Sequence, residues 1–178
     1  MAPLVEAPRT RVVEILEAQG ISYKLLPHES PVFTVEEAAR QRDVLIEEMV
    51  KSILLRDKKR QYVMACVRGD EQVDPKAVRA HLNDERFKRL QFATAEEIEQ
   101  VTGGCVMGAV APIGLPTEVP VLFDEALKQC ARYNTSSGDP VAGLELAAAD
   151  LIAVSGARFA PIARRDGQPE INEHGGVA

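Results

Sequence analysis

Apolar and polar positions alternate along this chain in short blocks, and no internal repeat is present. The apolar residues within 12–16 share one helical face, which predicts a helix from Pro8 to about Gln19 that ends at Gly20. The next block, 21–26, alternates with a period of two and predicts a strand. Helices and strands are therefore expected to mix from the first elements onward.

The clearest strand pattern is a pair of apolar segments at 49–56 and 62–67, joined by a turn of basic residues at 58–60. Two such segments around a short polar turn predict a β-hairpin. A short helical piece is expected just before them, around 44–48. Three further helix starts carry capping residues, at Thr34-Val-Glu-Glu37, Asp74-Pro75 and Thr94-Ala-Glu-Glu97.

The second half of the chain predicts short elements and a polar end. Strands are expected at 87–92, 119–123, 130–133, 141–146 and 159–162, short helices after Asp124 and at 147–151, and a loop at 134–140. Hairpins dominate over β-α-β units, so we predict an α+β fold. A single domain over 9–163 would hold a mixed, mostly antiparallel sheet that curls toward a barrel, flanked by short helices. Residues 1–8 are expected to form a loose N-terminus, and 164–178 a disordered tail.

Composition and charge are those of one folded domain, with 178 residues of which 46% are hydrophobic. The net charge of −6 argues against bulk, non-specific binding to nucleic acid, but it is compatible with a local basic patch. The sequence shows no membrane-spanning apolar run and no signal peptide, and its three cysteines are widely spaced. We therefore expect a cytoplasmic protein with reduced thiols and no membrane partner. Metal-ligand spacings such as CxxC are missing, so neither a metal nor another cofactor is expected.

The segment 103–115 has four glycines and one proline but no charged residue. A loop that merely connects two elements is usually polar. Glycine lets a backbone approach a ligand closely, and several free N–H groups would suit a phosphate or the oxyanion of an acyl-transfer reaction. A plain glycine-rich turn before a strand explains the composition equally well.

Lys51 is the most informative single residue, because a period of two places it on one strand face with Met49, Ile53 and Leu55. A lysine in such a place is costly unless it meets an anion or water. The alternative is a strand on which Lys51 points to solvent. The segment 51–60 has five basic residues and one acidic residue, a local charge of +4. That is typical of a solvated hairpin tip, or of a guide for a nucleic-acid backbone.

Other residues that could take part in chemistry are few. The hydroxyl-rich segment 135–138 could contact a substrate or simply form a turn. Among the three histidines, His28 is a better functional candidate than His81 or His174. Cys105 has no evident base beside it, which favours a small residue in a tight loop over a nucleophile. No serine triad can be assembled.

Four stretches coincide with the pattern of one family. They are the lysine strand 50–55, the Gly-x-x-x-Pro-x-Gly loop at 108–115, the helix entry at 31–38, and Ser137-Gly138 followed by 143–146. Their combination resembles the YbaK family, which includes the editing insertion of bacterial prolyl-tRNA synthetase and its free-standing relatives. The similarity runs over 9–163 in the family's order.

The resemblance implies a YbaK-like fold and an aminoacyl-tRNA deacylase. Such an enzyme hydrolyses in trans the ester that joins a small amino acid, such as Cys or Ala, to a misacylated tRNA, here tRNA(Pro). Water would attack the carbonyl, with Lys51 on the terminal nucleotide's phosphate, N–H groups at Gly108 on the oxyanion, and Ser137 near the aminoacyl group. The implied substrate-binding residues are Ser52, Val106, Met107, Ala109, Pro112, Gly114, Ser136, Gly138 and His28. The implied partners are the aminoacylated acceptor end of tRNA and, as a second candidate, prolyl-tRNA synthetase.

Two other functions stay open. A module that binds tRNA or a synthetase without hydrolysis fits the acidic charge, and it fits the lack of a histidine that can be placed in the aminoacyl pocket. A small-molecule hydrolase that uses Cys105 is a weaker third hypothesis. Relatives often carry threonine or asparagine where this chain has Ser52, and the segments 68–70 and 137–146 resemble alanine-specific and cysteine-specific members respectively.

Overall fold

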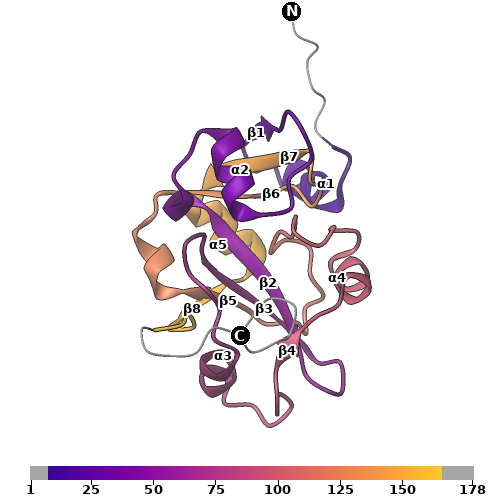
Figure 1. The fold of residues 1–178 in the computed structure, drawn as a ribbon. Helices are drawn as coiled ribbons and strands as arrows, with labels where there is room; N and C mark the ends of the chain where they lie inside the picture. The colour runs from indigo at the N-terminus through magenta and orange to yellow at the C-terminus, as the bar shows by residue number, and fades with distance from the viewer. Residues whose placement is uncertain (1–7, 166–178) are drawn as a thin grey trace, which may run out of the picture.

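The computed structural model describes residues 8–165, so the expectations for 1–7, for 166–178 and for His174 lie outside the described residues. Helices and strands mix along the chain (Figure 1). The α-helices are α1 Arg11–Ala18, α2 Val35–Arg42, α3 Pro75–Leu82, α4 Ala95–Thr102 and α5 Ala148–Ser155, with 3₁₀ turns η1 Ile46–Glu48 and η2 Glu125–Gln129. The strands are β1 Tyr23–Pro27, β2 Val50–Arg56, β3 Tyr62–Arg68, β4 Gln91–Phe92, β5 Val121–Asp124, β6 Arg132–Ser136, β7 Ala142–Ala147 and β8 Arg158–Ala160.

The strands form two sheets, which confirms the α+β fold but not the tendency toward a barrel. A three-stranded sheet has the order β1-β7-β6, and a five-stranded sheet has the order β4-β2-β3-β5-β8. Pairing is antiparallel except for β3–β5 and β5–β8, so the sheet is mixed as expected. Only the bridge between Met49 and Asn134 pairs backbone across the two sheets within 8–165. The described sheets are therefore not closed into a barrel.

The predicted hairpin is β2–β3, and it lies at the centre of the larger sheet. Its register runs from Val50 opposite Arg68 to Arg56 opposite Tyr62, and the turn is closed by Arg60 in the left-handed region at φ 60°. One core cluster packs residues of both sheets with α1 and α5, and a second lies on the other face of β2 and β3 under α3. Because both faces of β3 are covered, its sequence is nearly all apolar.

Several element boundaries differ from the expected ones for local reasons. The first helix begins after Thr10, whose hydroxyl accepts a hydrogen bond from the Val13 N–H at 3.3 Å, and not at Pro8. Of the weak strand at 87–92, only Gln91–Phe92 pairs, because Phe87 is buried in the second core. The expected loop at 134–140 starts three residues later, since 134–136 complete β6.

Figure 1 shows how the site is framed. The smaller sheet lies above the larger one, and β2 runs diagonally across the front from below α2 to β4. Among residues 8–165, no helix is long and apolar enough to cross a membrane.

Candidate active site

A cavity of about 1280 Å³ lies along β2 and is walled by segments that are distant in sequence. Its near end is formed by α2, the segment 107–110 and the residues that end and follow β6. Its far end is formed by the start of α3 and by 88–94. Ligand sites for small molecules measure about 300–1,000 Å³, so this cavity has room for more than one compact metabolite.

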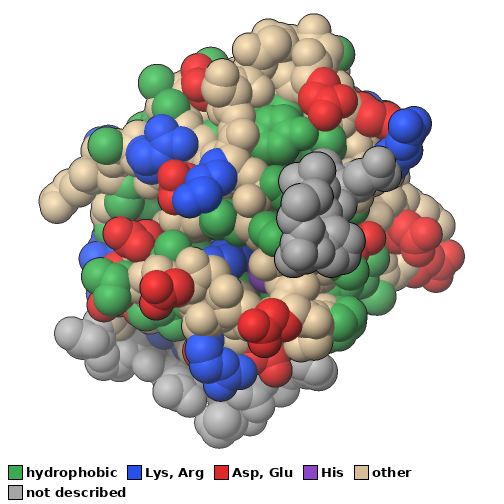
Figure 2. Space-filling model, turned by 90° about the horizontal axis from the view of Figure 1, so that it is seen from above, with side chains coloured by type: hydrophobic (Ala, Val, Ile, Leu, Met, Phe, Trp, Pro, Cys, Tyr) green, Lys and Arg blue, Asp and Glu red, His purple; other side chains and the backbone are tan. Residues whose placement is uncertain are grey.

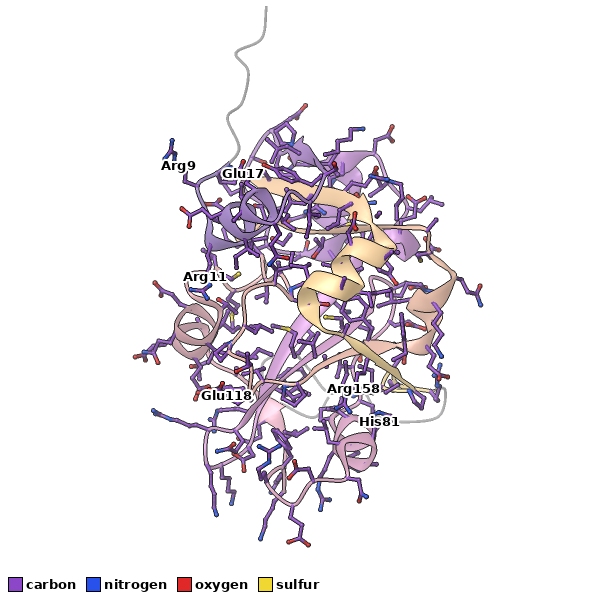
Figure 3. All side chains as sticks on the ribbon, turned by 180° about the vertical axis from the view of Figure 1, so that it is seen from behind. Arg9, Arg11, Glu17, His81, Glu118 and Arg158 are labelled. Atoms are coloured by element: carbon purple, nitrogen blue, oxygen red, sulfur yellow. The ribbon has the colours of Figure 1, made fainter. Side chains whose placement is uncertain are left out.

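The glycine-rich loop 103–115 reaches the cavity through its middle part. Gly108 has φ 87°, and a Cβ added to it would lie 2.6 Å from the carbonyl oxygen of Phe33. Glycine is needed there for both the backbone angle and the close approach. Gly114 has φ 77° and faces Ile15 and Arg11 of α1 instead. Figure 3 shows Arg11 between α1 and α4, so this end of the loop packs on a helix and not on the cavity.

Backbone donors are free where the loop lines the cavity. The Ala109 N–H donates to the Val106 carbonyl oxygen at 2.8 Å, which folds the loop into a turn. Among the described residues, the N–H groups of Met107, Gly108 and Val110 have no hydrogen-bond acceptor. A cluster of unpaired N–H groups at a cavity wall is the arrangement that an anionic oxygen requires.

The hydroxyl of Ser136 holds this turn against β6. Its Oγ donates to the Ala109 carbonyl oxygen at 2.7 Å and accepts from the Gly138 N–H at 3.2 Å. The Ser137 side chain points elsewhere: it is fully buried, and its Oγ donates to the Ala142 carbonyl oxygen at 2.7 Å. Ser136 lines the cavity and Ser137 does not, because the Ser137 hydroxyl is engaged within its own turn.

Lys51 lies at the cavity on β2 and is half-buried, like Ile53 two residues on. The opposite face of the strand carries Val50, Ser52 and Leu54, which are buried. Ser52 Oγ accepts a hydrogen bond from the Cys66 thiol at 3.4 Å. Lys51 forms no salt bridge with any described residue, so its charge is available to a ligand.

Arg42, at the end of α2, was not identified from the sequence. Its Nε donates to His28 Nε2 at 3.0 Å, and its Nη1 donates to the Thr135 carbonyl oxygen at 3.0 Å. His28 Nδ1 lies 2.7 Å from the Pro140 carbonyl oxygen, so His28 is neutral with its proton on Nδ1. Gly143 makes room for this group, because a Cβ there would collide with the Arg42 guanidinium.

The Arg42–His28 pair is shaped by burial. Burial lowers the pKa of Arg42 to about 10, which still leaves it charged at neutral pH. Burial, with a smaller contribution from the Arg42 charge, lowers the pKa of His28, although its hydrogen bond to Pro140 acts in the opposite direction. Arg42 has no carboxylate partner among the described residues, so a partly desolvated cation faces the cavity.

One buried hydroxyl beside Arg42 is also unpaired. Thr135 is 1% exposed and lines the cavity, yet its Oγ1 has no hydrogen-bond partner within the part of the chain that the structure describes. Buried hydroxyls nearly always find a partner within the protein or from a ligand. Within 8–165, no group of three or more His, Cys, Asp or Glu residues could hold a metal ion.

The structure brings together about half of the site residues expected from the sequence. Those that line the cavity are Lys51, Ser52, Met107, Gly108, Ala109, Ser136 and His28. Those that do not are Val106, Pro112, Gly114, Ser137 and Gly138. The basic hairpin tip lies apart from it: Arg56 Nε is 2.9 Å from Glu97 Oε2, and Arg60 Nε is 3.9 Å from Glu97 Oε1. The upper face of the molecule, seen from above, has mixed acidic and basic side chains (Figure 2).

Comparison with known proteins gives three consistent likenesses. The family model described as "Aminoacyl-tRNA editing domain" matches residues 29–154, a range that contains Arg42, Lys51 and Gly108. The "Prolyl-tRNA editing protein ProX" of Acetoanaerobium sticklandii is 30% identical over 121 residues, covering 65% of this chain and 71% of that protein. The "Proline--tRNA ligase" of Kosmotoga olearia is 37% identical over 123 residues, covering 69% of this chain and 18% of the ligase.

The chain thus spans about a fifth of the length of the ligases that it matches. Among solved structures, one described as a candidate trans-editing enzyme for prolyl-tRNA synthetase superposes with a TM-score of 0.77. It is 26% identical, and the alignment covers 90% of this chain and 99% of that one. The fold is therefore that of these editing-domain neighbours over nearly its whole length.

Proposed function

We propose, from the premise that the chain belongs to the aminoacyl-tRNA editing domain family, that it hydrolyses the ester bond of a misacylated tRNA. The observation that carries the proposal is a cavity with two cations, Lys51 and Arg42, that pair with no carboxylate among the described residues, and three backbone N–H groups at 107–110 that have no acceptor there. A substrate with a phosphate and a reacting carbonyl suits both sets of groups. The terminal nucleotide of an aminoacylated tRNA has both.

Water is the nucleophile in this proposal. It attacks the ester carbonyl, and the tetrahedral intermediate places its negative oxygen at the N–H groups of Met107, Gly108 and Val110. The intermediate then releases the ribose oxygen, which is protonated by solvent, and the amino acid leaves as a carboxylate. Loss of one such preorganised donor costs on the order of 3–4 kcal/mol in the barrier.

The two cations orient the substrate. Lys51 holds the phosphate of the terminal nucleotide, and the Arg42 guanidinium binds its oxygens or the ribose. Thr135 contributes its carbonyl oxygen, which accepts from Arg42 Nη1 at 3.0 Å and so helps to position the guanidinium. Ser136 acts indirectly, by fixing the loop turn through Ala109. The expected direct contact of Ser137 is not part of this arrangement, because its hydroxyl is engaged within its own turn.

The proposed tRNA is tRNA(Pro), which the names of the editing protein and of the ligases suggest. Prolyl-tRNA synthetase is the corresponding candidate partner. The near end of the cavity is lined by apolar side chains such as Val32, Val35 and Met49. Such a wall favours a small amino acid of low polarity, such as Ala or Cys, because it leaves a strongly polar side chain without partners.

A panel of charged tRNAs tests the proposal. Purified protein is incubated with tRNA(Pro) carrying Ala, Cys, Ser or Pro, and release of the amino acid is followed over time. We expect deacylation of Ala- or Cys-tRNA(Pro), loss of at least about 100-fold in Lys51→Ala, and near wild-type rates in Lys58→Ala at the exposed hairpin tip. If the protein binds tRNA but releases no amino acid faster than buffer does, it is a binding module and not a deacylase.

A further inference from the structure

The far end of the cavity carries basic residues that the ester chemistry does not use. This distal end consists of the start of α3 and the segment 88–94, and its basic residues are Lys76, Arg79, Lys88 and Arg89. The four side chains are exposed and form no salt bridge with any described residue. They belong to a chain whose net charge is −6, so their gathering in one place is not a general property of its surface.

Acidic residues near the distal end are engaged with other groups or, like the exposed Glu85, do not line the cavity. Asp84 pairs with Arg86 at 2.6 Å, and Asp74 caps α3 by accepting the Lys76 N–H at 2.9 Å. Glu97 pairs with Arg56 at 2.9 Å on the hairpin side. Among the described residues that line the whole cavity, Asp139 is the one acid, and it lies at the near end. The distal end therefore presents uncompensated positive charge to whatever enters.

The geometry connects the distal end to the reacting end. Strand β2 runs from below α2 to β4 (Figure 1), and residues from both ends of this path line the same cavity. From Lys51 to Leu55, which pairs with Phe92, the strand spans about 13 Å. That length accommodates about four stacked nucleotides of one strand at 3.4 Å each.

An aromatic side chain accompanies the positive charge. Phe92 is half-buried and lines the cavity beside Lys88, Arg89 and Gln91. A basic groove with an aromatic surface is the usual arrangement for single-stranded nucleic acid, because the cations follow the backbone and the ring stacks on a base. The hairpin tip, by contrast, has basic residues without an aromatic neighbour that lines the cavity.

We propose that the distal end binds the phosphodiester backbone of the single-stranded 3′ segment that precedes the reacting nucleotide. The inference rests on the proposed function, since it extends that site along the same tRNA strand. Lys76, Lys88 and Arg89 neutralise successive phosphates, and Phe92 stacks on one base. Arg79 supports the segment, because its Nε donates to the Phe87 carbonyl oxygen at 3.2 Å.

The test compares two proteins that lose the same charge. One carries Lys76→Gln, Lys88→Gln and Arg89→Gln; its control carries Lys24→Gln, Lys58→Gln and Lys59→Gln, which are exposed and outside the cavity lining. Binding of a fluorescent single-stranded RNA with the sequence of the tRNA 3′ end is measured by anisotropy over a range of salt concentrations. Deacylation is measured on charged tRNA and on aminoacyl-adenosine, which has no preceding phosphates.

We expect the distal variant to bind the RNA at least about tenfold more weakly, with a salt slope smaller by about 2 units for three lost contacts on single-stranded RNA. Its kcat/KM on charged tRNA should fall in parallel, while hydrolysis of aminoacyl-adenosine is unchanged. The control variant should stay within about twofold of the wild type in every assay.

Two outcomes would overturn the inference, and one would overturn only the proposed function. Wild-type RNA affinity in the distal variant removes the RNA site even if the protein deacylates tRNA. Displacement of the RNA by an acidic peptide of equal charge, at equal concentration, removes the assignment to nucleic acid. A protein that hydrolyses neither ester, but loses RNA binding in the distal variant alone, keeps the RNA site and loses the deacylase function.

Discussion

At the tip of the β2–β3 hairpin, Arg56 and Arg60 approach one carboxylate, that of Glu97, with Nε–Oε distances of 2.9 and 3.9 Å. At the near end of the cavity, Arg42 has no carboxylate among the described residues and instead donates to His28 and to the Thr135 carbonyl oxygen. The tip has the higher density of basic residues in the sequence. Arg42, whose charge is available to a ligand, lies in the cavity.

This contrast separates a cation that stabilises the fold from a cation that can bind a ligand. At the tip, Glu97 neutralises its neighbours and also caps α4 by accepting the Thr94 N–H at 2.9 Å, so the group holds an element in place. Arg42 is partly desolvated, and neutral acceptors position it without cancelling its charge. A protein maintains such an uncompensated charge at a cost, which an anionic ligand can offset.

The largest effect is expected on replacing Arg42, because its charge is available to a substrate. We expect Arg42→Met to lower kcat/KM for deacylation by about 100-fold, since a charge-assisted contact to the substrate is lost. Its free energy of unfolding should fall by no more than about 1–2 kcal/mol, because the variant leaves the Thr135 carbonyl oxygen without its donor but also removes a desolvated cation. The measurement is deacylation of the best substrate of the charged-tRNA panel, together with urea unfolding.

The matched variant is Arg60→Met at the tip, which removes an equal charge and should keep deacylation within about twofold of the wild type. Equal losses of activity in the two variants would show that the long-range field of the protein matters, and that the position of Arg42 does not.

The next largest effect is expected at Gly108, which belongs to the loop whose backbone donors line the same cavity as Arg42. In Gly108→Ala the new Cβ meets the Phe33 carbonyl oxygen at 2.6 Å, and φ is positive. The loop must shift, so we expect deacylation to fall about tenfold or more and the free energy of unfolding to fall by about 1–3 kcal/mol.

Gly104→Ala is the control on the same loop. Its φ is also positive, at 122°, but an added Cβ has no neighbour within 4 Å. It should lose some stability and keep its activity. If it loses as much activity as Gly108→Ala, general loop strain explains both, and the position of the Gly108 N–H does not.

Local patterns allowed part of this site to be predicted. The period of two around Lys51 and the composition of 103–115 are properties of neighbouring residues, and both features line the cavity. Arg42 could not be found in this way, because its partners lie 14 residues before it and 93 residues after it. Such contacts depend on how α2 packs on β6, and no short-range pattern encodes that.

The prediction for Ser137 shows that the exact residue at which a strand ends decides which side chain faces a site. The segment 134–140 was expected to be a loop, in which either serine could face the cavity. Because β6 continues to Ser136, that residue faces Ala109 and the cavity, and Ser137 turns into the core. Whether the sheet closes into a barrel could not be predicted for a related reason, since pairing between distant strands decides it.

Replacing Glu97 tests whether the paired charges at the hairpin tip stabilise the fold. Glu97→Gln keeps a side-chain oxygen for the Thr94 cap but removes the charge that Arg56 and Arg60 share. We expect the free energy of unfolding to fall by about 1–2 kcal/mol, because Arg56 is left without a counter-charge in a largely buried place. Deacylation should be unchanged. Urea unfolding measures the loss, with Glu96→Gln, on the exposed side of the same helix, as the control.

A loss of activity in Glu97→Gln with unchanged stability would contradict the structural role of the hairpin tip. It would mean that the tip contacts the substrate and that the paired arginines there are not merely structural.

The smallest effect concerns His28 and pH. Burial lowers its pKa in the folded protein below the usual value of about 6.5, so the unfolded chain binds this proton more readily. Stability from this group is therefore full above about pH 7 and is lost as the pH falls through 6.5 toward the lowered pKa. Protonation also removes the acceptor that Arg42 uses, at 3.0 Å.

The loss should appear as a fall in the urea midpoint between pH 7.5 and 5, and His28→Gln should flatten that dependence. His81→Gln is the control, because His81 is exposed on α3 and does not line the cavity (Figure 3). An equal flattening in both variants would assign the pH dependence to histidine titration in general. A selective effect in His28→Gln would locate it at the Arg42 contact, where acid would place two cations side by side in the cavity wall.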